Sequence, residues 1–262
     1  SIVDGDIQHT GVIQNLLKNE QITHVIHLAA QAGVRYSITH PEAYLRTNID
    51  GFLQVLEAIR KYPEIPLVYA SSSSVYGLNK KVPFSIDDTT DSQANFYGVT
   101  KKTNELMAAT YHYLYNLSVV GLRFFTVYGP WGRPDMAYYK FAKAIQAGVS
   151  IDVYNQGNMR RDFTYIDDIV AGVVASLDVP RGNYLFNIGN EKPESLLYLI
   201  NCLETYLGKK AILNLLPMPL GEIEETWADI TTSKQQLRYL PKTSLVDGMN
   251  NFLDWFCTYN QN

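Results

Sequence analysis

The chain has 262 residues, of which 46% are hydrophobic, and its 26 acidic and 22 basic side chains give a net charge of −4. This content suffices for one sizeable core, or for a main domain with a smaller lobe, and excludes a disordered chain. The charge balance excludes a broad basic surface, so we expect neither nucleic acid nor a membrane as a partner.

The two cysteines and the polar start of the chain point to a protein of a reducing compartment. Cys202 and Cys257 match no disulfide or metal-ligand spacing, so we expect two filler side chains and no metal site. The first residues do not resemble a signal peptide, and no apolar run approaches the roughly 20 residues of a membrane span. We therefore expect a cytoplasmic protein.

Taken in chain order, short β-branched runs alternate with longer helical patterns, which is typical of a parallel sheet covered by helices. The first part has predicted strands at 22–28, 66–70 and 117–122 and predicted helices at 41–59 and 95–115. The later part has predicted helices near 136–147, 166–177, 195–207 and 245–256 and a predicted strand near 151–154. We predict an α/β fold in which residues 1–130 form a doubly wound sheet domain. Residues 131–262 mainly form a smaller lobe, and some of their segments return to the first sheet.

Candidate functional residues follow three of the predicted strands. Residues 29–35 are small and end in one cation, residues 71–74 are four serines, and residues 124–133 combine aromatic, glycine and arginine side chains. In doubly wound sheets ligands bind beyond the carboxyl ends of the strands. We therefore expect polar groups from three strands to line one crevice.

A Tyr-x-x-x-Lys element begins the predicted helix at 95–115. One helical turn places Tyr97 and Lys101 on the same face, where the ammonium can lower the pKa of the phenol and make it a usable base. The same spacing occurs at Tyr76 and Lys80, Tyr139 and Lys143, and Tyr206 and Lys210. Context distinguishes Tyr97, because its helix follows the serine-rich strand end and can bring Ser72 opposite the phenol. The alternative is that the serines form only a polar turn.

Five blocks together resemble the extended short-chain dehydrogenase/reductases. These blocks are residues 27–37, 69–77, 97–101, 126–137 and 159–168. Within that family the sequence is most similar to the UDP-glucuronate 4-epimerases. The resemblance implies NAD as cofactor, a UDP-sugar substrate, a Rossmann-like sheet truncated on its N-terminal side and a C-terminal α/β substrate lobe. It also implies a homodimer formed through the helices at 41–59 and 95–115.

The resemblance implies 4-epimerisation of UDP-glucuronate to UDP-galacturonate through a 4-keto intermediate. Tyr97 would remove the hydroxyl proton with the help of Ser72, and Lys101 would bind the nicotinamide ribose and depress the pKa of Tyr97. Related dehydratases and decarboxylases have a carboxylate where this chain has Ser73 and Ser74. Without that acid/base, elimination loses its catalyst and epimerisation is favoured.

Further site residues are carried over from the same resemblance. The cofactor side comprises Asp6, Ile7, Leu28, Ala29, Ala30, Asn48, Tyr97 and Lys101, and the substrate side comprises Arg35, Ser73, Thr126, Arg133, Val153 and Arg161. Ser73, Thr126 and Arg133 would hold the sugar carboxylate. Arg161 would hold the pyrophosphate, and Val153 with Tyr154 would border the uracil.

For three of these assignments, an explanation that involves no ligand fits the sequence as well. Arg133 fits a surface cation, Asn48 fits a polar residue on a helix face, and Val153 with Tyr154 fits an ordinary strand pair. Arg160 is expected to face solvent.

Two departures from the family pattern leave alternatives open. No Gly-x-x-Gly-x-x-Gly turn, which would hold the dinucleotide pyrophosphate, precedes the first predicted strand. We therefore expect that Val25, Ile26 and Val68 face water. We also expect that these 262 residues alone do not catalyse turnover of the substrate. The alternative function is a catalytically inactive remnant that at most binds a nucleotide sugar or dimerises.

The second departure concerns the substrate. The segment 219–222, Pro-Leu-Gly-Glu, replaces a family Gln-Pro-Gly-Asp element that lies near the nucleotide. UDP-galacturonate, N-acetylated UDP-hexoses and non-acidic UDP-hexoses remain alternative starting sugars. The resemblance suggests polysaccharide supply as the pathway.

Overall fold

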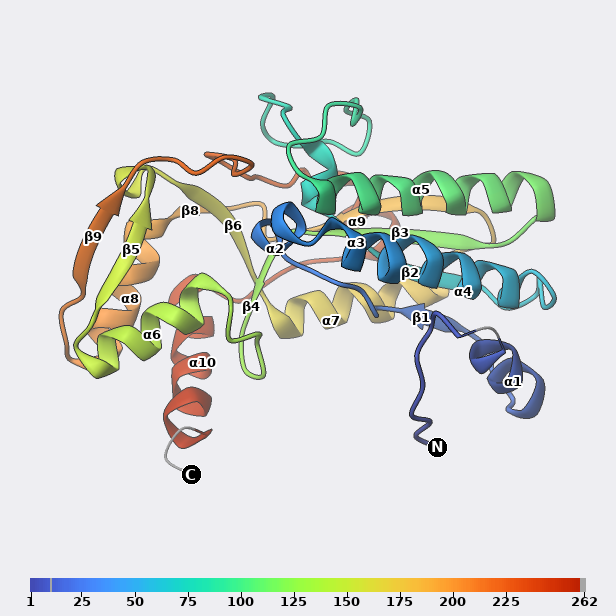
Figure 1. The fold of residues 1–262 in the computed structure, drawn as a ribbon, viewed down its shortest axis with the longest axis horizontal. Coiled ribbons are helices and arrows are strands. Elements are labelled where there is room, and N and C mark those ends of the chain that lie inside the picture. Colours follow the sequence, from blue (N-terminus) through green and yellow to red (C-terminus); the bar gives the residue numbers. More distant parts are fainter. Residues whose placement is uncertain (10, 260–262) are drawn as a thin grey trace.

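The computed structural model describes residues 1–9 and 11–259, and a four-stranded parallel sheet forms the centre of its N-terminal part (Figure 1). The strands, in spatial order, are β1 (Val25–His27), β2 (Leu67–Ser72), β3 (Val119–Phe124) and β7 (Asn183–Ile188). Leu67 lies opposite Val25 on one side and Val119 on the other, and Ser72 lies opposite Phe124. The carboxyl ends of β2, β3 and β7 therefore lie level at one edge of the sheet.

Helices cover both faces of this sheet because its side chains alternate between two apolar cores. Leu67 and Tyr69 pack on one face against α1 (Val12–Asn19), α4 (Gly51–Ile59) and α5 (Phe96–Tyr115). Val68 packs on the other face against α7 (Ile166–Ala175) and α9 (Thr231–Leu237). A parallel sheet buried on both faces confirms the predicted doubly wound α/β fold.

The helices that flank the site follow the predicted ranges closely. The predicted helix 41–59 is α3 (Pro41–Tyr44), a π-helical segment (Leu45–Asp50) and α4 in succession, preceded by a short α2 (Val34–Thr39). The side chain of Asn95 caps α5 by accepting a hydrogen bond from the Gly98 amide at 2.9 Å. A 3-10 turn (Ser73–Tyr76) follows β2 directly. The end of β2 and the start of α5 are therefore both well defined.

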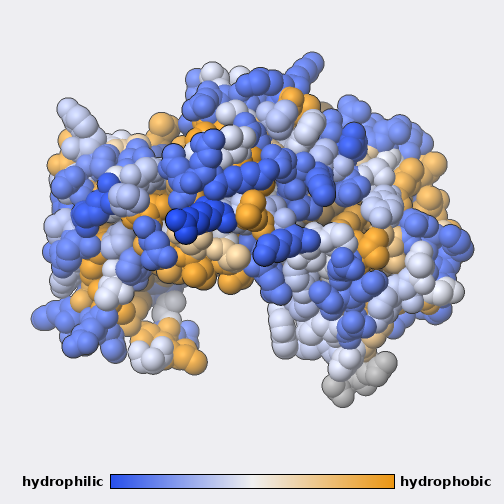
Figure 2. Space-filling view, turned by 180° about the vertical axis from the view of Figure 1, so that it is seen from behind, coloured by the Kyte–Doolittle hydropathy of each residue, from blue (hydrophilic) through white to orange (hydrophobic). Residues whose placement is uncertain are grey.

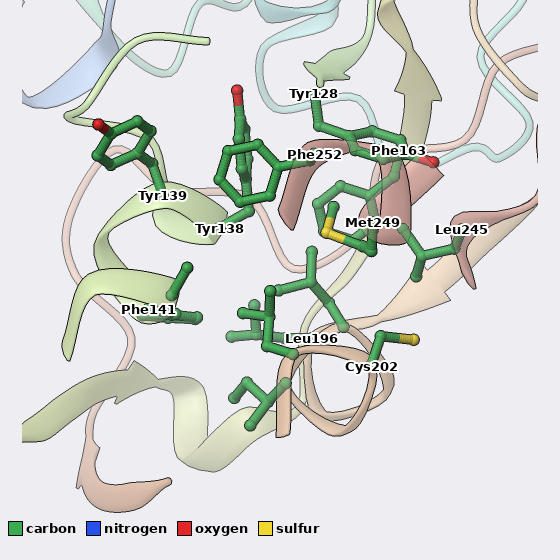
Figure 3. Close-up of a cluster of buried hydrophobic side chains, with 14 of the residues drawn as sticks. Tyr128, Tyr138, Tyr139, Phe141, Phe163, Leu196, Cys202, Leu245, Met249 and Phe252 are labelled. Atoms are coloured by element: carbon green, nitrogen blue, oxygen red, sulfur yellow. The ribbon is translucent and has the colours of Figure 1, made fainter. Parts of the chain in front are cut away.

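The second lobe is built around three helices that enclose an aromatic core. Its elements are α6 (Ala137–Ala147), α8 (Leu196–Leu207) and α10 (Leu245–Tyr259), a three-stranded sheet of β4 (Thr126–Tyr128), β6 (Arg160–Tyr165) and β8 (Pro193–Ser195), and a pair of β5 (Ser150–Tyr154) with β9 (Ile212–Leu216). Two 3-10 turns cover Asn155–Gly157 and Ser176–Asp178. Figure 3 shows Phe252 of α10 against Tyr138 of α6, with ring centroids 4.9 Å apart.

The chain passes between the two parts more than once. After β6 it returns through α7 and β7 to the first sheet, and α9 returns to it again before α10. From behind, Figure 2 shows a notch between the part that bears the N-terminus and the lobe that bears α10. We keep the division at residue 130 as a proposal, because both halves contribute to the first sheet.

The expectation that Val68 faces water is wrong. Only 1% of its surface is exposed, because β2 lies inside the sheet and α7 and α9 cover that face. Val25 is half-buried, whereas Ile26 on the outer strand β1 is 41% exposed. The exposed apolar surface of this sheet is therefore limited to its β1 side.

No described helix is long and apolar enough to cross a membrane. Among residues 1–9 and 11–259, no three His, Cys, Asp or Glu side chains gather closely enough to hold a metal ion. Cys202 is buried in the second-lobe core and Cys257 is half-buried beside it, and both are free thiols.

Candidate active site

Ser72 and Tyr97 meet where β2 ends and α5 begins. Ser72 accepts a hydrogen bond from the Ser74 amide at 3.1 Å and so begins the 3-10 turn. A Cβ added to Gly98 would lie 2.7 Å from the Ser74 carbonyl oxygen, so only glycine lets α5 approach the turn this closely. The Ser72 hydroxyl consequently faces the Tyr97 phenol and acts on its pKa. This is the predicted juxtaposition.

Burial raises the pKa of Tyr97 above its ordinary value. Two groups act in the opposite direction, namely the Ser72 hydroxyl and the positive charge of Arg133. Lys101 is not among the groups that shift the pKa of Tyr97 here, so its predicted effect in the NAD-bound site stays a prediction. Lys101 is turned to the strand backbone, so the phenol depends on Ser72 and Arg133.

Lys101 is a buried ammonium group whose N–H donors are only partly used. Its side chain is 3% exposed, and Nζ donates to the Ala70 carbonyl at 2.9 Å. Burial lowers the pKa of Lys101 to about 8. Within the described residues the Ala70 carbonyl is its one acceptor, so two of its three N–H groups remain available for another ligand.

The residues after β1 leave open space on the cofactor side. Leu28 is 55% exposed, Ala29 is exposed and Ala30 is half-buried. Asp6 is exposed and accepts from the Gln8 amide at 2.9 Å. The exposure of these residues leaves the chain after β1 accessible to a ligand, as the resemblance implies for NAD.

Asn48 and Ile7 both contact neighbouring elements of the first part of the chain. Asn48 is 2% exposed, its Nδ2 donates to Thr100 at 2.9 Å and to the Gln31 carbonyl at 3.0 Å, and its Oδ1 accepts from the Gln31 amide. Its polar atoms therefore join the loop after β1 to α5. Ile7 lies against Gly51 of α4, where an added Cβ would come within 2.8 Å of Ile7 Cδ1.

The predicted carboxylate-binding group lies at the start of the second lobe. Arg133 forms a two-pronged ion pair with Asp135, with Nε to Oδ1 at 3.0 Å and Nη2 to Oδ2 at 2.9 Å. Its charge acts on the phenols of both Tyr97 and Tyr44, so the guanidinium lies on the side of the proposed base. Ser73 and Thr126 are half-buried.

Arg35 and Arg161 come from different parts of the fold and share one carboxylate. Arg35 Nε lies 3.4 Å from Glu222 Oε1, and Arg161 Nη2 lies 3.5 Å from Glu222 Oε2. The Arg35 guanidinium also lies over the Tyr154 ring, 4.4 Å from its centroid. Arg160 is 56% exposed, which confirms that it faces solvent.

The expectation that Val153 borders the uracil is wrong. Its exposed fraction is 0%, because the β5 side chains alternate and Val153 points into the core of the second lobe. Its neighbour Tyr154 is half-buried and lies under Arg35, so Tyr154 is the β5 residue that can face a ligand.

Sequence reasoning missed a buried ionic network beneath the serine turn. Arg123 of β3 binds Glu105 of α5 through Nε at 2.8 Å and Nη2 at 2.9 Å, and its Nη1 donates to the Tyr76 hydroxyl at 3.1 Å. Ser71 donates to Glu105 at 2.7 Å, and Tyr76 donates to Asn187 at 2.6 Å. A signal was present, because Glu105 follows Lys101 by one helical turn and so lies on the helix face that was predicted to carry Tyr97 and Lys101.

Comparisons with known proteins agree with this geometry. The chain is 49% identical over 245 residues to an uncharacterized protein of Methanocaldococcus jannaschii, an alignment that covers 94% of this chain and 75% of that protein. It is 47% identical over 276 residues to UDP-glucuronate 4-epimerase 4 of Arabidopsis thaliana, covering 98% of this chain and 63% of that protein. The chain thus spans less than two thirds of the length of the plant relative.

Solved structures show the same fold. A UDP-glucuronic acid 4-epimerase from Bacillus cereus, crystallised with UDP-glucuronic acid and NAD, superposes with a TM-score of 0.91 at 37% identity. That match covers 97% of this chain and 81% of the other. The family described as "NAD dependent epimerase/dehydratase" matches residues 1–189. The chain therefore belongs to the NAD-dependent epimerase/dehydratase family, a group of extended short-chain dehydrogenase/reductases whose cofactor is NAD.

Proposed function

We propose that this chain carries the catalytic residues for NAD-dependent 4-epimerisation of UDP-glucuronate to UDP-galacturonate. The observation that carries the proposal is the contact between Ser72 and the Tyr97 phenol beside the buried ammonium of Lys101. The likeness to UDP-glucuronate 4-epimerases supports the choice of sugar. On the same likeness we propose a cytoplasmic enzyme that supplies polysaccharide synthesis.

The proposed roles follow from the positions of the three side chains. Tyr97, as its phenolate, takes the proton from the sugar 4-hydroxyl and becomes neutral, and Ser72 stabilises the phenolate before the transfer. Lys101 directs its spare N–H groups to the nicotinamide ribose. When bound, NAD supplies the hydride acceptor and later returns the hydride. Tyr97 then gives its proton back to the 4-oxygen of the sugar, which has turned its other face to the cofactor.

The substrate keeps all its atoms because no carboxylate is present at the positions that would drive elimination. Ser73 and Ser74 follow Ser72 in the turn, and a hydroxyl there cannot act as a general acid/base near neutral pH. Arg133 already holds the Asp135 carboxylate with two hydrogen bonds, which is the geometry a uronate carboxylate needs. We propose that Arg133, Ser73 and Thr126 bind that carboxylate and select an acidic sugar.

We also propose that the protein forms a homodimer through α4 and α5. These helices pack side by side, and the Tyr111 hydroxyl of α5 donates to Glu57 of α4 at 2.6 Å. The outer face of α5 exposes Val99, Leu106 and Tyr113, which are spaced by seven residues and so lie along one side of the helix. An apolar stripe of this kind fits a second copy of the same helix pair.

Binding and turnover are tested separately. Calorimetry should show that the purified chain binds UDP-glucuronate more tightly than UDP-glucose. Arg133→Ala should remove that preference, whereas Arg160→Ala, which removes a solvent-facing arginine, should keep it. Equal affinity of the wild-type chain for the two sugars would refute the assigned sugar class.

Turnover is scored by the appearance of UDP-galacturonate with added NAD, in a form of the protein that also carries a glycine-rich dinucleotide-binding turn, because these 262 residues alone are not expected to catalyse turnover. Tyr97→Phe in that form serves as the matched inactive variant. We expect Tyr97→Phe to retain UDP-glucuronate binding and to lose turnover. Tight UDP-glucuronate binding without turnover at any NAD concentration, also in the form that carries the dinucleotide-binding turn, would favour the alternative function, a non-catalytic UDP-sugar-binding protein.

A further inference from the structure

The carboxylate of Glu222 lies between two arginines that come from different parts of the fold. Arg35 belongs to α2 beside the first sheet, and Arg161 belongs to β6 of the second lobe. The loop that carries Glu222 is attached to the start of α5, because Asn95 Nδ2 donates to the Gly221 carbonyl at 3.3 Å. Gly221 has φ of +80°, which favours glycine and sets the direction of the next residue. Glu222 thus bridges the two parts within the proposed nucleotide-sugar site.

Arg161 hydrogen-bonds to backbone carbonyls through one nitrogen, and its other nitrogen is placed to bind an anion. Its side chain is 16% exposed, and Nη1 donates to the carbonyls of Arg160 and Glu224, each at 2.9 Å. Nη2 is directed to Glu222. Burial lowers the pKa of Arg161, and the negative charge of Glu222 opposes that effect. A guanidinium at such a position needs an anionic partner, and Glu222 is its one ion-pair partner among the described residues.

Arg35 is held in position by an aromatic ring and remains accessible. Its guanidinium lies over Tyr154, and its side chain is 57% exposed. Stacking fixes the plane of the guanidinium and leaves its edge free to bind oxygen atoms. Arg35 and Arg161 therefore present two cationic edges to the same carboxylate.

The charges and distances in this group favour exchange of Glu222 for a stronger anion. Two guanidinium groups against one carboxylate leave an excess of positive charge. The separations of 3.4 and 3.5 Å are longer than the roughly 2.7–2.9 Å of a tight charge-assisted hydrogen bond. A diphosphate brings more negative charge and more acceptor oxygens than one carboxylate does.

We propose that Glu222 occupies the place of the substrate diphosphate between Arg35 and Arg161 and competes with it, so that Glu222 sets the affinity of the site for nucleotide diphosphates. This inference rests on the proposed function, because it assumes that the two arginines bind the diphosphate of a UDP-sugar. Glu222 stands where the family usually has Asp, and its extra methylene gives the carboxylate a longer reach toward the arginines. Affinity for the diphosphate is lowered, and product release is favoured, by the same competition.

The test is isothermal titration calorimetry with UDP and with uridine on three forms of the 262-residue protein. Glu222→Gln keeps the side-chain size and removes the charge. Glu225→Gln is the matched control, because Glu225 lies on the same segment and pairs with the solvent-facing Arg160 at 3.6 Å. We expect Glu222→Gln to bind UDP about five- to tenfold more tightly, since one like charge is removed at a few ångströms. Uridine affinity should not change, and Glu225→Gln should behave like the wild type.

Three results would overturn the inference, and they separate it from the proposed function. If the wild type binds UDP and Glu222→Gln binds it equally or more weakly, Glu222 does not compete and the proposed function stands. If Glu222→Gln raises the affinity for UDP and for uridine by the same factor, the variant acts by opening the loop that carries residue 222 and not by removing charge. If none of the three forms binds UDP, the nucleotide-sugar site itself is wrong, and the proposed function falls together with the inference.

Discussion

Lys101 is a site residue whose burial lowers the stability of the folded chain. Burial lowers its pKa to about 8 from an ordinary value of 10.5, so the charged form is disfavoured in the folded state. This cost is fully present below pH 8 and disappears as the pH rises toward 10.5, where the unfolded chain also loses its proton. The Lys101 side chain therefore lowers the free energy of unfolding near neutral pH.

We accordingly expect Lys101→Met to be more stable than the wild type at pH 7 and to be inactive. The gain in the free energy of unfolding should be roughly 1–3 kcal/mol, after the loss of the hydrogen bond to the Ala70 carbonyl. Urea denaturation at pH 7 and at pH 10 measures it, and the advantage should shrink at the higher pH. A variant that is less stable at pH 7 would show that the ammonium contributes more through contacts than it costs through burial.

His27 gives the complementary prediction at acid pH. It is buried against Phe52, and burial, followed by the charge of Lys101, lowers the pKa of His27 to about 4. The unfolded chain binds a proton near pH 6.5 and the folded chain does so only near pH 4. Stability is therefore lost as the pH falls from about 6.5 to about 4, by up to about 3 kcal/mol.

The check is the pH dependence of urea denaturation in His27→Gln, which should flatten this part of the profile. His24→Gln is the matched control, since His24 lies in the same segment but is exposed. Parallel profiles for the wild type and His27→Gln would exclude His27 as the source of acid sensitivity.

At the scale of elements, α5 and β3 are joined by the buried Arg123–Glu105 ion pair. Removing one partner leaves an unpaired buried charge, so Glu105→Gln should lower the free energy of unfolding by about 3–5 kcal/mol. Because Ser71 and Tyr76 on either side of Ser72 bind the same network, kcat should fall as well. The double variant Glu105→Gln with Arg123→Met should recover much of the stability, as measured by thermal unfolding.

Glu57→Gln, which removes the partly exposed ion pair between Glu57 of α4 and Arg60 just after it, serves as the control for this prediction, because glutamine keeps an oxygen that can accept from the Tyr111 hydroxyl. It should lose far less stability, because exposed ion pairs contribute little. Equal losses for the buried and the exposed pair would mean that burial does not decide the cost.

The elements that could be predicted from the sequence are those whose pattern is local. The helix α5 has an N-cap at Asn95 and a continuous helical pattern, and it was predicted within a residue. The strand β6 was missed because its first residues are Arg-Arg-Asp. Asp162 is nonetheless fully buried, and it accepts hydrogen bonds from the Asn190, Glu191 and Ala228 amides, which come from distant loops. A buried polar strand of this kind depends on partners that only the tertiary fold supplies.

The residues of the site also fall into those that could be predicted from a local sequence pattern and those that could not. Ser72, Tyr97 and Lys101 were predicted because a strand end and a helix start bring them together within a short stretch of chain. The contact of Glu222 with Arg35 and Arg161 was not predictable, because it joins three segments that lie far apart in the sequence and meet only in the folded chain. The assignment of Val153 failed because a two-residue strand pair does not show which side chain faces the core.

At the scale of the whole molecule, the site lies where two parts of the chain meet. The end of β2 supplies Ser72 and the start of α5 supplies Tyr97 and Lys101, while Arg133 and Arg161 come from the segments that build the second lobe. Glu222 and the Asn95–Gly221 hydrogen bond connect the two sides. Changes in the relative position of the lobes would therefore alter substrate binding before they altered the contact between Ser72 and Tyr97.

The proposed dimer is also a property of the whole molecule, because the outer side of α5 carries apolar surface that no other described element covers. Leu106 is 57% exposed near the middle of that helix. A charge at this position would lie in an apolar interface, so Leu106→Asp should convert the dimer to a monomer in size-exclusion chromatography with light scattering. Val170→Asp is the control, since Val170 is 48% exposed on α7, on the opposite face of the sheet. A wild-type chain that is monomeric at all concentrations, or a dimer disrupted equally by both variants, would contradict an interface through α4 and α5.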